Sequence, residues 1–188
     1  MTVIAFKEGK MAADSLCTDT EDTKMYNVKK IYRLTSGGLL GTAGDDDCRE
    51  IVELMDSVSS EEHLPEKETI AETKIDFLGM LALPDGTIWY IMNEMVAYSN
   101  SDEWNGFIGE VTEDMYVCGS GGLLALGAME AGADVEEAVE IAIKRNAACG
   151  GEIQIDEIPD WLEKRIELGK SFGKPKKPKK RKHKNAKR

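Results

Sequence analysis

The sequence has no long hydrophobic run and no closely spaced cysteines. Among its 188 residues no segment of 18 or more consecutive apolar residues occurs, and a membrane-spanning helix needs such a segment. The first ten residues, MTVIAFKEGK, lack the basic region and the apolar region of a secretory signal. The four cysteines, Cys17, Cys48, Cys118 and Cys149, form no CxxC pair, which argues against a zinc site and against a disulfide framework. We therefore expect a soluble, cytoplasmic protein.

Acidic residues are missing from the end of the chain. All 35 Asp and Glu residues lie in residues 1–169, whereas 11 of the 24 Lys and Arg residues lie in residues 170–188. This end segment has few apolar residues, so we expect a disordered basic tail, 170–188, on a folded domain, 1–169. Such a tail either raises solubility, folds back on the acidic body or contacts nucleic acid or another polyanion. No aromatic residue follows Phe172, so stacking on bases is not expected.

Histidines are scarce, which limits the chemistry that the chain can offer. The two that occur, His63 and His183, lie in a polar stretch and in the tail, so a histidine-based triad is not expected. The consecutive carboxylates of residues 45–47 open an expected helix, where a solvated cap is more usual than a cation site. The acidic stretch 19–22 has a similar explanation, a solvated turn.

The hydrophobic pattern alternates between strand and helix periods along the first 169 residues. It predicts strands over 2–6, 10–15, 29–34, 39–43, 75–83, 87–92, 116–118 and 152–155. It predicts helices over 45–58, 123–131, 135–146 and 159–168, with a capping box at Asp134 and Glu137. This order favours an α+β protein with two antiparallel sheets covered by helices over a parallel βαβ sheet.

Two short segments are weak functional candidates when each is taken alone. Gly119-Ser120-Gly121-Gly122 precedes a helix, so its amides either bind an anion or only pack the helix on a strand; the lysine of a P-loop is missing. Thr2 becomes the N-terminal residue if Met1 is removed, which is expected because threonine is small. A free α-amino group has a pKa near 8, so an N-terminal threonine carries a nucleophile and a base on one residue.

Six short motifs occur in the order and spacing found in one known family. They are Thr2-Val3-Ile4, Ala12-Ala13-Asp14-Ser15, Asn27-Val28-Lys29-Lys30-Ile31, Gly41-Thr42-Ala43-Gly44-Asp45, Gly119-Ser120-Gly121-Gly122 and, after the helix over 134–146, Cys149-Gly150-Gly151. Through these motifs, residues 2–155 resemble the N-terminal-nucleophile (Ntn) threonine peptidases, the family of the proteasome β subunits and their bacterial HslV-type relatives. The resemblance covers about four-fifths of the chain.

The resemblance implies a four-layer αββα sandwich, the Ntn-hydrolase fold, and roles for five residues. Thr2 matches the nucleophile. Lys30 matches a lysine whose charge favours the anionic hydroxyl and the neutral amine, and Asp14 matches the carboxylate paired with that lysine. The backbone amide of Gly41 matches the oxyanion donor. Ser120 matches a serine that orients water and relays protons.

Two positions differ from the proteasome branch of the family. Asn146 and Cys149 stand where that branch has Asp and Ser, and we expect them to support the site, although asparagine carries no charge and cysteine is a weaker hydrogen-bonding partner. Lys29 and Lys30 are neighbours on an expected strand, so only one of them can enter the site. We expect Lys30 to do so, because it precedes an apolar residue as the lysine of the family does.

The resemblance further implies a threonine-type endopeptidase that acts on proteins or peptides inside a self-compartmentalising homo-oligomeric ring. It implies no cofactor and no metal, and it implies an ATP-dependent unfoldase as a partner. Because Thr2 directly follows Met1, no propeptide is expected. Two alternatives stay open: a catalytically inactive scaffold whose basic tail contacts nucleic acid or another polyanion, and an amidase that acts on a small amide.

Overall fold

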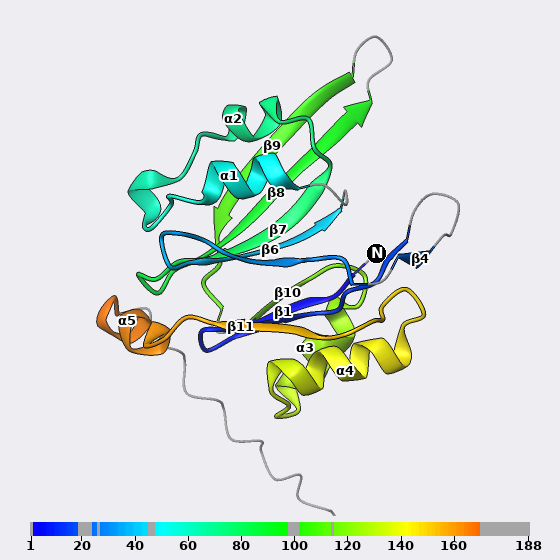
Figure 1. The fold of residues 1–188 in the computed structure, drawn as a ribbon. Helices are drawn as coiled ribbons and strands as arrows, with labels where there is room; N and C mark the ends of the chain where they lie inside the picture. The colour runs from blue at the N-terminus through cyan, green and yellow to red at the C-terminus, as the bar shows by residue number, and fades with distance from the viewer. Residues whose placement is uncertain are drawn as a thin grey trace, which may run out of the picture.

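Two antiparallel sheets face each other in the computed structural model, which describes residues 2–18, 24–25, 27–44, 48–97, 102–113 and 115–169 (Figure 1). This arrangement confirms the expected α+β class with two antiparallel sheets. The expected basic tail and the acidic runs 19–22 and 45–47 lie outside the described residues. Within those described ranges, no helix is long and apolar enough to cross a membrane.

The first sheet has four strands in the order β10–β1–β2–β11. They are β1 (Ile4–Lys7), β2 (Lys10–Ala13), β10 (Met115–Cys118) and β11 (Gln154–Glu157). A two-residue turn joins β1 to β2, and its residues Glu8 and Gly9 have φ angles of 53° and 89°. Turns with two positive φ angles match the twist of a hairpin, which explains why the two strands pair directly.

The second sheet has five strands in the sequential order β5–β6–β7–β8–β9. They are β5 (Ile31–Arg33), β6 (Leu39–Gly44), β7 (Phe77–Ala82), β8 (Ile88–Ala97) and β9 (Asp102–Glu110). β3 (Cys17–Thr18) pairs with β4 (Lys24–Met25) in a separate two-stranded ribbon that the sequence pattern does not predict.

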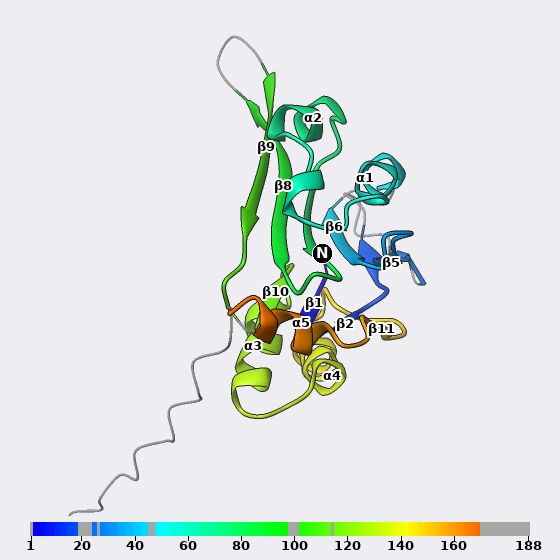
Figure 2. The same cartoon turned by 90° about the vertical axis from the view of Figure 1, so that its left-hand side faces the viewer.

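Helices cover the outer face of each sheet (Figures 1 and 2). The five-stranded sheet carries α1 (Arg49–Met55) and α2 (Lys67–Glu72), which follows a short 3-10 turn, η1 (Glu61–His63). The four-stranded sheet carries α3 (Gly122–Glu130) and α4 (Val135–Arg145), and α5 (Trp161–Glu167) follows β11. The capping box expected at the start of α4 is present, with the Asp134 carboxylate accepting from the Glu137 amide at 2.9 Å.

Apolar side chains fill the space between the sheets and the space under each helix pair. In β1, Ile4 and Phe6 face the other sheet, whereas Ala5 faces α3 and α4. In β6, Leu39 faces the four-stranded sheet and Leu40 faces α1. Successive side chains of a strand point to opposite faces, so strands covered on both faces are apolar at every position.

Among the elements that were not expected from the sequence are β9 and α2. β9 pairs with β8 along its whole length although its sequence, DEWNGFIGE, has little apolar alternation. The short helix α2 lies against it, and a Cβ at Gly106 would come within 2.1 Å of the Lys67 carbonyl oxygen. The close approach of α2 to β9 therefore depends on a glycine that would ordinarily weaken a strand prediction.

Candidate active site

Thr2 lies two residues before the start of β1 and is held by the loop that follows β10. Its carbonyl oxygen accepts hydrogen bonds from the Gly121 amide at 3.1 Å and from the Ser120 hydroxyl at 3.4 Å. Gly119 has a φ of 85°, and a Cβ there would lie 2.3 Å from the Thr2 carbonyl oxygen. Only glycine fits against Thr2 at this point, and only glycine adopts this φ without strain. The glycine-rich loop therefore packs on Thr2, which is 3% exposed.

Asp14, the residue after β2, points its carboxylate at Thr2. Its Oδ1 accepts from the Thr2 hydroxyl at 2.5 Å and from the Val3 amide at 3.0 Å. Its Oδ2 accepts from the Gly150 amide at 2.9 Å. The side chain is fully buried, so its charge requires these donors and a nearby cation.

Lys30 supplies that cation. Its Nζ lies 2.8 Å from Asp14 Oδ1 and donates to the Leu16 carbonyl oxygen at 2.5 Å and also to the Thr2 hydroxyl oxygen. The three protons of the ammonium thus have three acceptors, which satisfies a side chain that is only 6% exposed. The neighbouring Lys29 is exposed, with its Nζ 4.8 Å from the centre of the Tyr32 ring.

The three side chains form one buried cluster, which we call the Thr2 cluster: Thr2, Asp14 and Lys30. The Thr2 hydroxyl donates to a carboxylate and accepts from an ammonium at the same time. A cation at this position favours the anionic form of a hydroxyl, and the carboxylate holds both partners in place. The cluster can therefore activate the Thr2 oxygen as a nucleophile without a histidine.

A pocket of about 350 Å³ opens beside the Thr2 cluster, between the end of β6 and the start of α3. Thr2, Gly44 and Ser120 lie on its wall, together with the apolar side chains of Leu78 and Met92. A hydroxyl at the wall of a partly apolar pocket lies where it can contact a molecule bound in that pocket.

Gly41, the expected oxyanion donor, is not among the residues that line this pocket, and its role stays a prediction. It pairs with Ile31 of β5 and Met80 of β7, and a Cβ there would lie 3.0 Å from a methyl carbon of Ile4, inside the space between the sheets. Gly44 is three residues further along β6, a distance of about 10 Å in a strand. Gly44 is exposed, with a φ of 138°, and it does line the pocket with Thr2.

Asn146 and Cys149 lie behind the loop that holds Thr2. The Asn146 amide donates to the Ser120 carbonyl oxygen at 3.1 Å, and its own carbonyl accepts from the Ala148 amide at 3.0 Å. Cys149 is buried, and a Cβ at Gly121 would lie 2.7 Å from its sulfur. Burial, and after it the Asp14 carboxylate, raises the pKa of the Cys149 thiol, so it stays neutral. Both residues can support the loop although neither carries a charge.

Several groups of the site have no sequence signal. The Gly150 amide on Asp14 and the Leu16 carbonyl on Lys30 are backbone groups, which any residue type supplies. Gln154 of β11 hydrogen-bonds to the backbone of Lys30 and was not expected to contribute. Pattern matching finds side chains that do chemistry, and it overlooks the groups that hold them.

The remaining histidine and carboxylate positions of the described structure form no second catalytic or metal site. His63 is exposed in η1, with its Nδ1 3.1 Å from the Ser60 hydroxyl. No group of three or more His, Cys, Asp or Glu residues in the described ranges could hold a metal ion.

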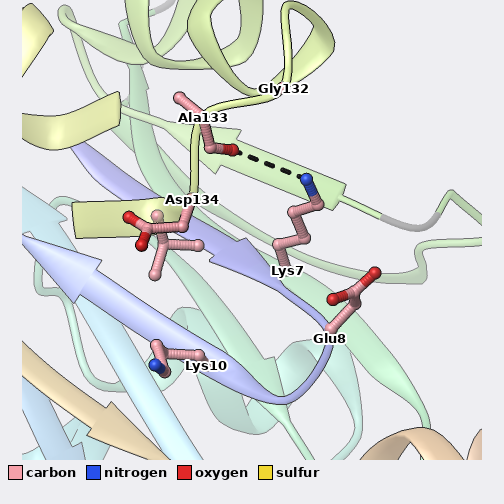
Figure 3. Close-up of a pocket in the computed structure, with 7 residues that line it drawn as sticks. Lys7, Glu8, Lys10, Gly132, Ala133 and Asp134 are labelled. Carbon is pink, nitrogen blue, oxygen red and sulfur yellow. Dashed lines mark hydrogen bonds between the residues drawn. The ribbon is translucent and has the colours of Figure 1, made fainter. Parts of the chain in front are cut away.

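A second pocket, of about 190 Å³, lies at the start of α4 (Figure 3). Lys7 and Lys10 line it with Glu8 and Asp134, and Lys7 donates to the Ala133 carbonyl oxygen at 3.5 Å. Its charges have both signs and Asp134 already caps the helix, so this pocket has no pattern that points to a ligand.

The chain was compared with protein-family models and with curated proteins, and neither comparison found a match.

Proposed function

We propose that the protein is an N-terminal threonine hydrolase of the Ntn type, acting as a peptidase, with Thr2 as its nucleophile after removal of Met1. The observation that carries this proposal is the Thr2 cluster, in which the Thr2 hydroxyl bonds to a buried Asp14–Lys30 ion pair. The order of layers, helices on a five-stranded sheet that faces a four-stranded sheet with its own helices, supports the four-layer αββα sandwich of that family.

The proposed reaction begins with attack of the Thr2 hydroxyl oxygen on a peptide carbonyl carbon. The hydroxyl proton passes to the free α-amine of Thr2, which is partly neutral near pH 7 because its ordinary pKa is about 8. We assign the oxyanion to the backbone amide of Gly44, because Gly44 lines the pocket with Thr2 and Gly41 does not.

Collapse of this intermediate breaks the carbon–nitrogen bond, and the leaving amine takes the proton held by the Thr2 ammonium. The product is an ester between Thr2 and the acyl part of the substrate. Water then attacks the ester carbon, with the Thr2 amine again accepting a proton, and the acid product leaves. Lys30 favours the neutral amine and the developing negative charge on Thr2 throughout, and Asp14 keeps Lys30 in place.

The pocket wall predicts a preference for basic residues near the scissile bond. Asp76 and Glu94 bring carboxylates to a pocket that is apolar at Leu78 and Met92. A lysine or arginine side chain has an aliphatic stem and a charged end, which matches this combination. We expect kcat/KM for lysine-containing peptides to exceed kcat/KM for their norleucine analogues. In Glu94→Gln the ratio of these two values should fall by about two- to fivefold, since exposed charge pairs contribute about 0.2–1 kcal/mol.

The matched control for this experiment is Glu103→Gln, which removes an exposed carboxylate from β9 that is not among the described residues of the pocket wall. The same ratio should be unchanged in this variant. Equal ratios in all three proteins would show that the Glu94 carboxylate does not select for charge.

Ring assembly, delivery of substrate by an ATP-dependent unfoldase and contact of the tail with a polyanion are further parts of the proposal. They come from the resemblance and from the charge of residues 170–188. They do not affect the chemistry assigned to Thr2.

The proposal is tested by treating the purified protein with a threonine-directed covalent probe, measuring the intact mass and mapping the adduct. We expect loss of Met1 and one adduct on Thr2. Retained Met1, or a free Thr2 that does not react, would contradict the enzyme and favour the inactive scaffold. A labelled Thr2 that hydrolyses small amides but not peptides would favour the amidase.

A further inference from the structure

One side chain of β11 reaches across to the segment that carries Lys30. Gln154, the single glutamine of the sequence, accepts at its Oε1 from the Lys30 amide at 2.9 Å and from the Ile31 amide at 3.3 Å. Its Nε2 donates to the Val28 carbonyl oxygen at 2.5 Å. The side-chain amide therefore pairs with the backbone of residues 28–31 in the way that a neighbouring strand would.

This contact completes the support of Lys30 from both sheets. The Lys30 carbonyl oxygen accepts from the Thr42 amide of β6 at 2.9 Å, so one side of its backbone is held by the five-stranded sheet. The Lys30 amide is held by Gln154, which belongs to the four-stranded sheet. With both backbone groups fixed, the direction of the side chain is fixed as well, and Lys30 points inward while Lys29 stays exposed.

We propose that Gln154 is a positioning residue that holds the backbone of Lys30 so that its ammonium reaches the Thr2 hydroxyl. This inference rests on the proposed function for its effect on catalysis, but not for its effect on Lys30. This role requires a side chain on β11 that is as long as glutamine and carries both a hydrogen-bond acceptor and a hydrogen-bond donor at its end. Leucine keeps the approximate size and loses both, whereas glutamate keeps the acceptor and loses the donor.

The first experiment compares peptide hydrolysis by Gln154→Leu, Gln154→Glu and the wild-type protein. We expect Gln154→Leu to lower kcat by about 100-fold with little change in KM, because a small displacement of a catalytic group is sufficient for such a loss. The acid limb of its pH–rate profile should move to higher pH, since a more distant cation disfavours the protonated Thr2 amine less. Gln154→Glu should recover part of the kcat.

The matched control is Asp156→Asn on the same face of β11. Asp156 also links β11 to β5, through Arg33, whose Nε lies 3.1 Å from Asp156 Oδ2, but among the described residues no hydrogen bond joins it to Lys30. This variant should keep kcat within about twofold, as expected for an exposed ion pair. Equal losses in Asp156→Asn and Gln154→Leu, or an unchanged kcat in Gln154→Leu, would overturn the inference.

The second experiment does not depend on activity. The folded protein is treated briefly with an amine-acylating reagent, and the labelling rates of Lys29 and Lys30 are measured by peptide mass. Lys30 should be protected in the wild-type protein. It should label about tenfold faster in Gln154→Leu, because loss of the hydrogen bonds from Gln154 allows the segment around Lys30 to open locally. Lys29 should label equally in both.

The two experiments separate the two proposals. Unchanged protection of Lys30 in Gln154→Leu would refute the positioning role whatever the protein does. Increased labelling of Lys30 together with a Thr2 that never reacts with the probe would refute the proposed function and leave the positioning role intact.

Discussion

Replacing Thr2 with alanine is expected to lower peptide hydrolysis by about 10⁴-fold or more, since loss of a nucleophile removes the covalent route entirely. The hydroxyl that is lost is the group that bonds to both Asp14 and Lys30. Alanine is small enough for removal of Met1 to proceed as with threonine, so the free amine is kept. Initial rates with fluorogenic peptides, together with labelling by the threonine-directed probe, measure the effect.

Two further variants make this result specific. Thr2→Ser keeps a hydroxyl at the same position and should keep measurable hydrolysis and labelling. Thr112→Ala removes an exposed threonine elsewhere and should behave as wild type. In Thr2→Ala, Lys30 keeps Asp14 and the Leu16 carbonyl as partners, so the stability cost should be only about 1 kcal/mol. A rate of peptide hydrolysis in Thr2→Ala equal to that of the wild-type protein would show that Thr2 is not the nucleophile.

Replacing Asp14 with asparagine is expected to lower the free energy of unfolding by about 3–5 kcal/mol, because it leaves the Lys30 charge buried without a counter-charge. The side chains of the pair are 6% and 0% exposed for Lys30 and Asp14. A loss of this size should lower Tm by on the order of 10 °C in a domain of this length. Lys30→Met should also destabilise the protein, and both variants should be inactive.

The double variant tests whether the two residues act as a pair. Asp14→Asn combined with Lys30→Met should cost less than the sum of the single changes, because neither charge is then left alone. A matched cycle on Glu140 and Lys144 of α4 is the control, since this pair has a similar separation of 2.9 Å but side chains that are 49% and 67% exposed. It should show a coupling of at most about 1 kcal/mol. Additive effects at Asp14 and Lys30 would contradict the pairing.

Local features of this protein follow directly from its sequence. The β1–β2 hairpin and the capping box of α4 depend on residues a few positions apart, Glu8 with Gly9 and Asp134 with Glu137. The interactions that stabilise them join residues within a few positions of one another, so both features can be predicted without knowledge of the fold. The α+β class follows in the same way from the order of strand and helix periods.

Features that depend on distant contacts could not be predicted so well. β9 is polar, and its place in the sheet comes from pairing with β8 and from the approach of α2 to Gly106. The positions of Gly41 and Gly44 depend on where β6 passes Thr2: Gly41 faces the space between the sheets, and Gly44 lines the pocket. Gln154 has no motif at all, because its partners are backbone groups of residues 28–31.

The sequence by itself determined which residue types are available: a threonine after Met1, one early aspartate in the motif Ala12–Ser15, a pair of lysines and a glycine-rich loop. Only the tertiary structure decided that Thr2, Asp14 and Lys30 meet within hydrogen-bonding distance. Thr2 and Asp14 flank one hairpin of the four-stranded sheet, and Lys30 precedes the first strand of the five-stranded sheet. The physical reason is that the packing of one sheet on the other brings these segments together, and the burial of a charge makes each partner necessary to the others.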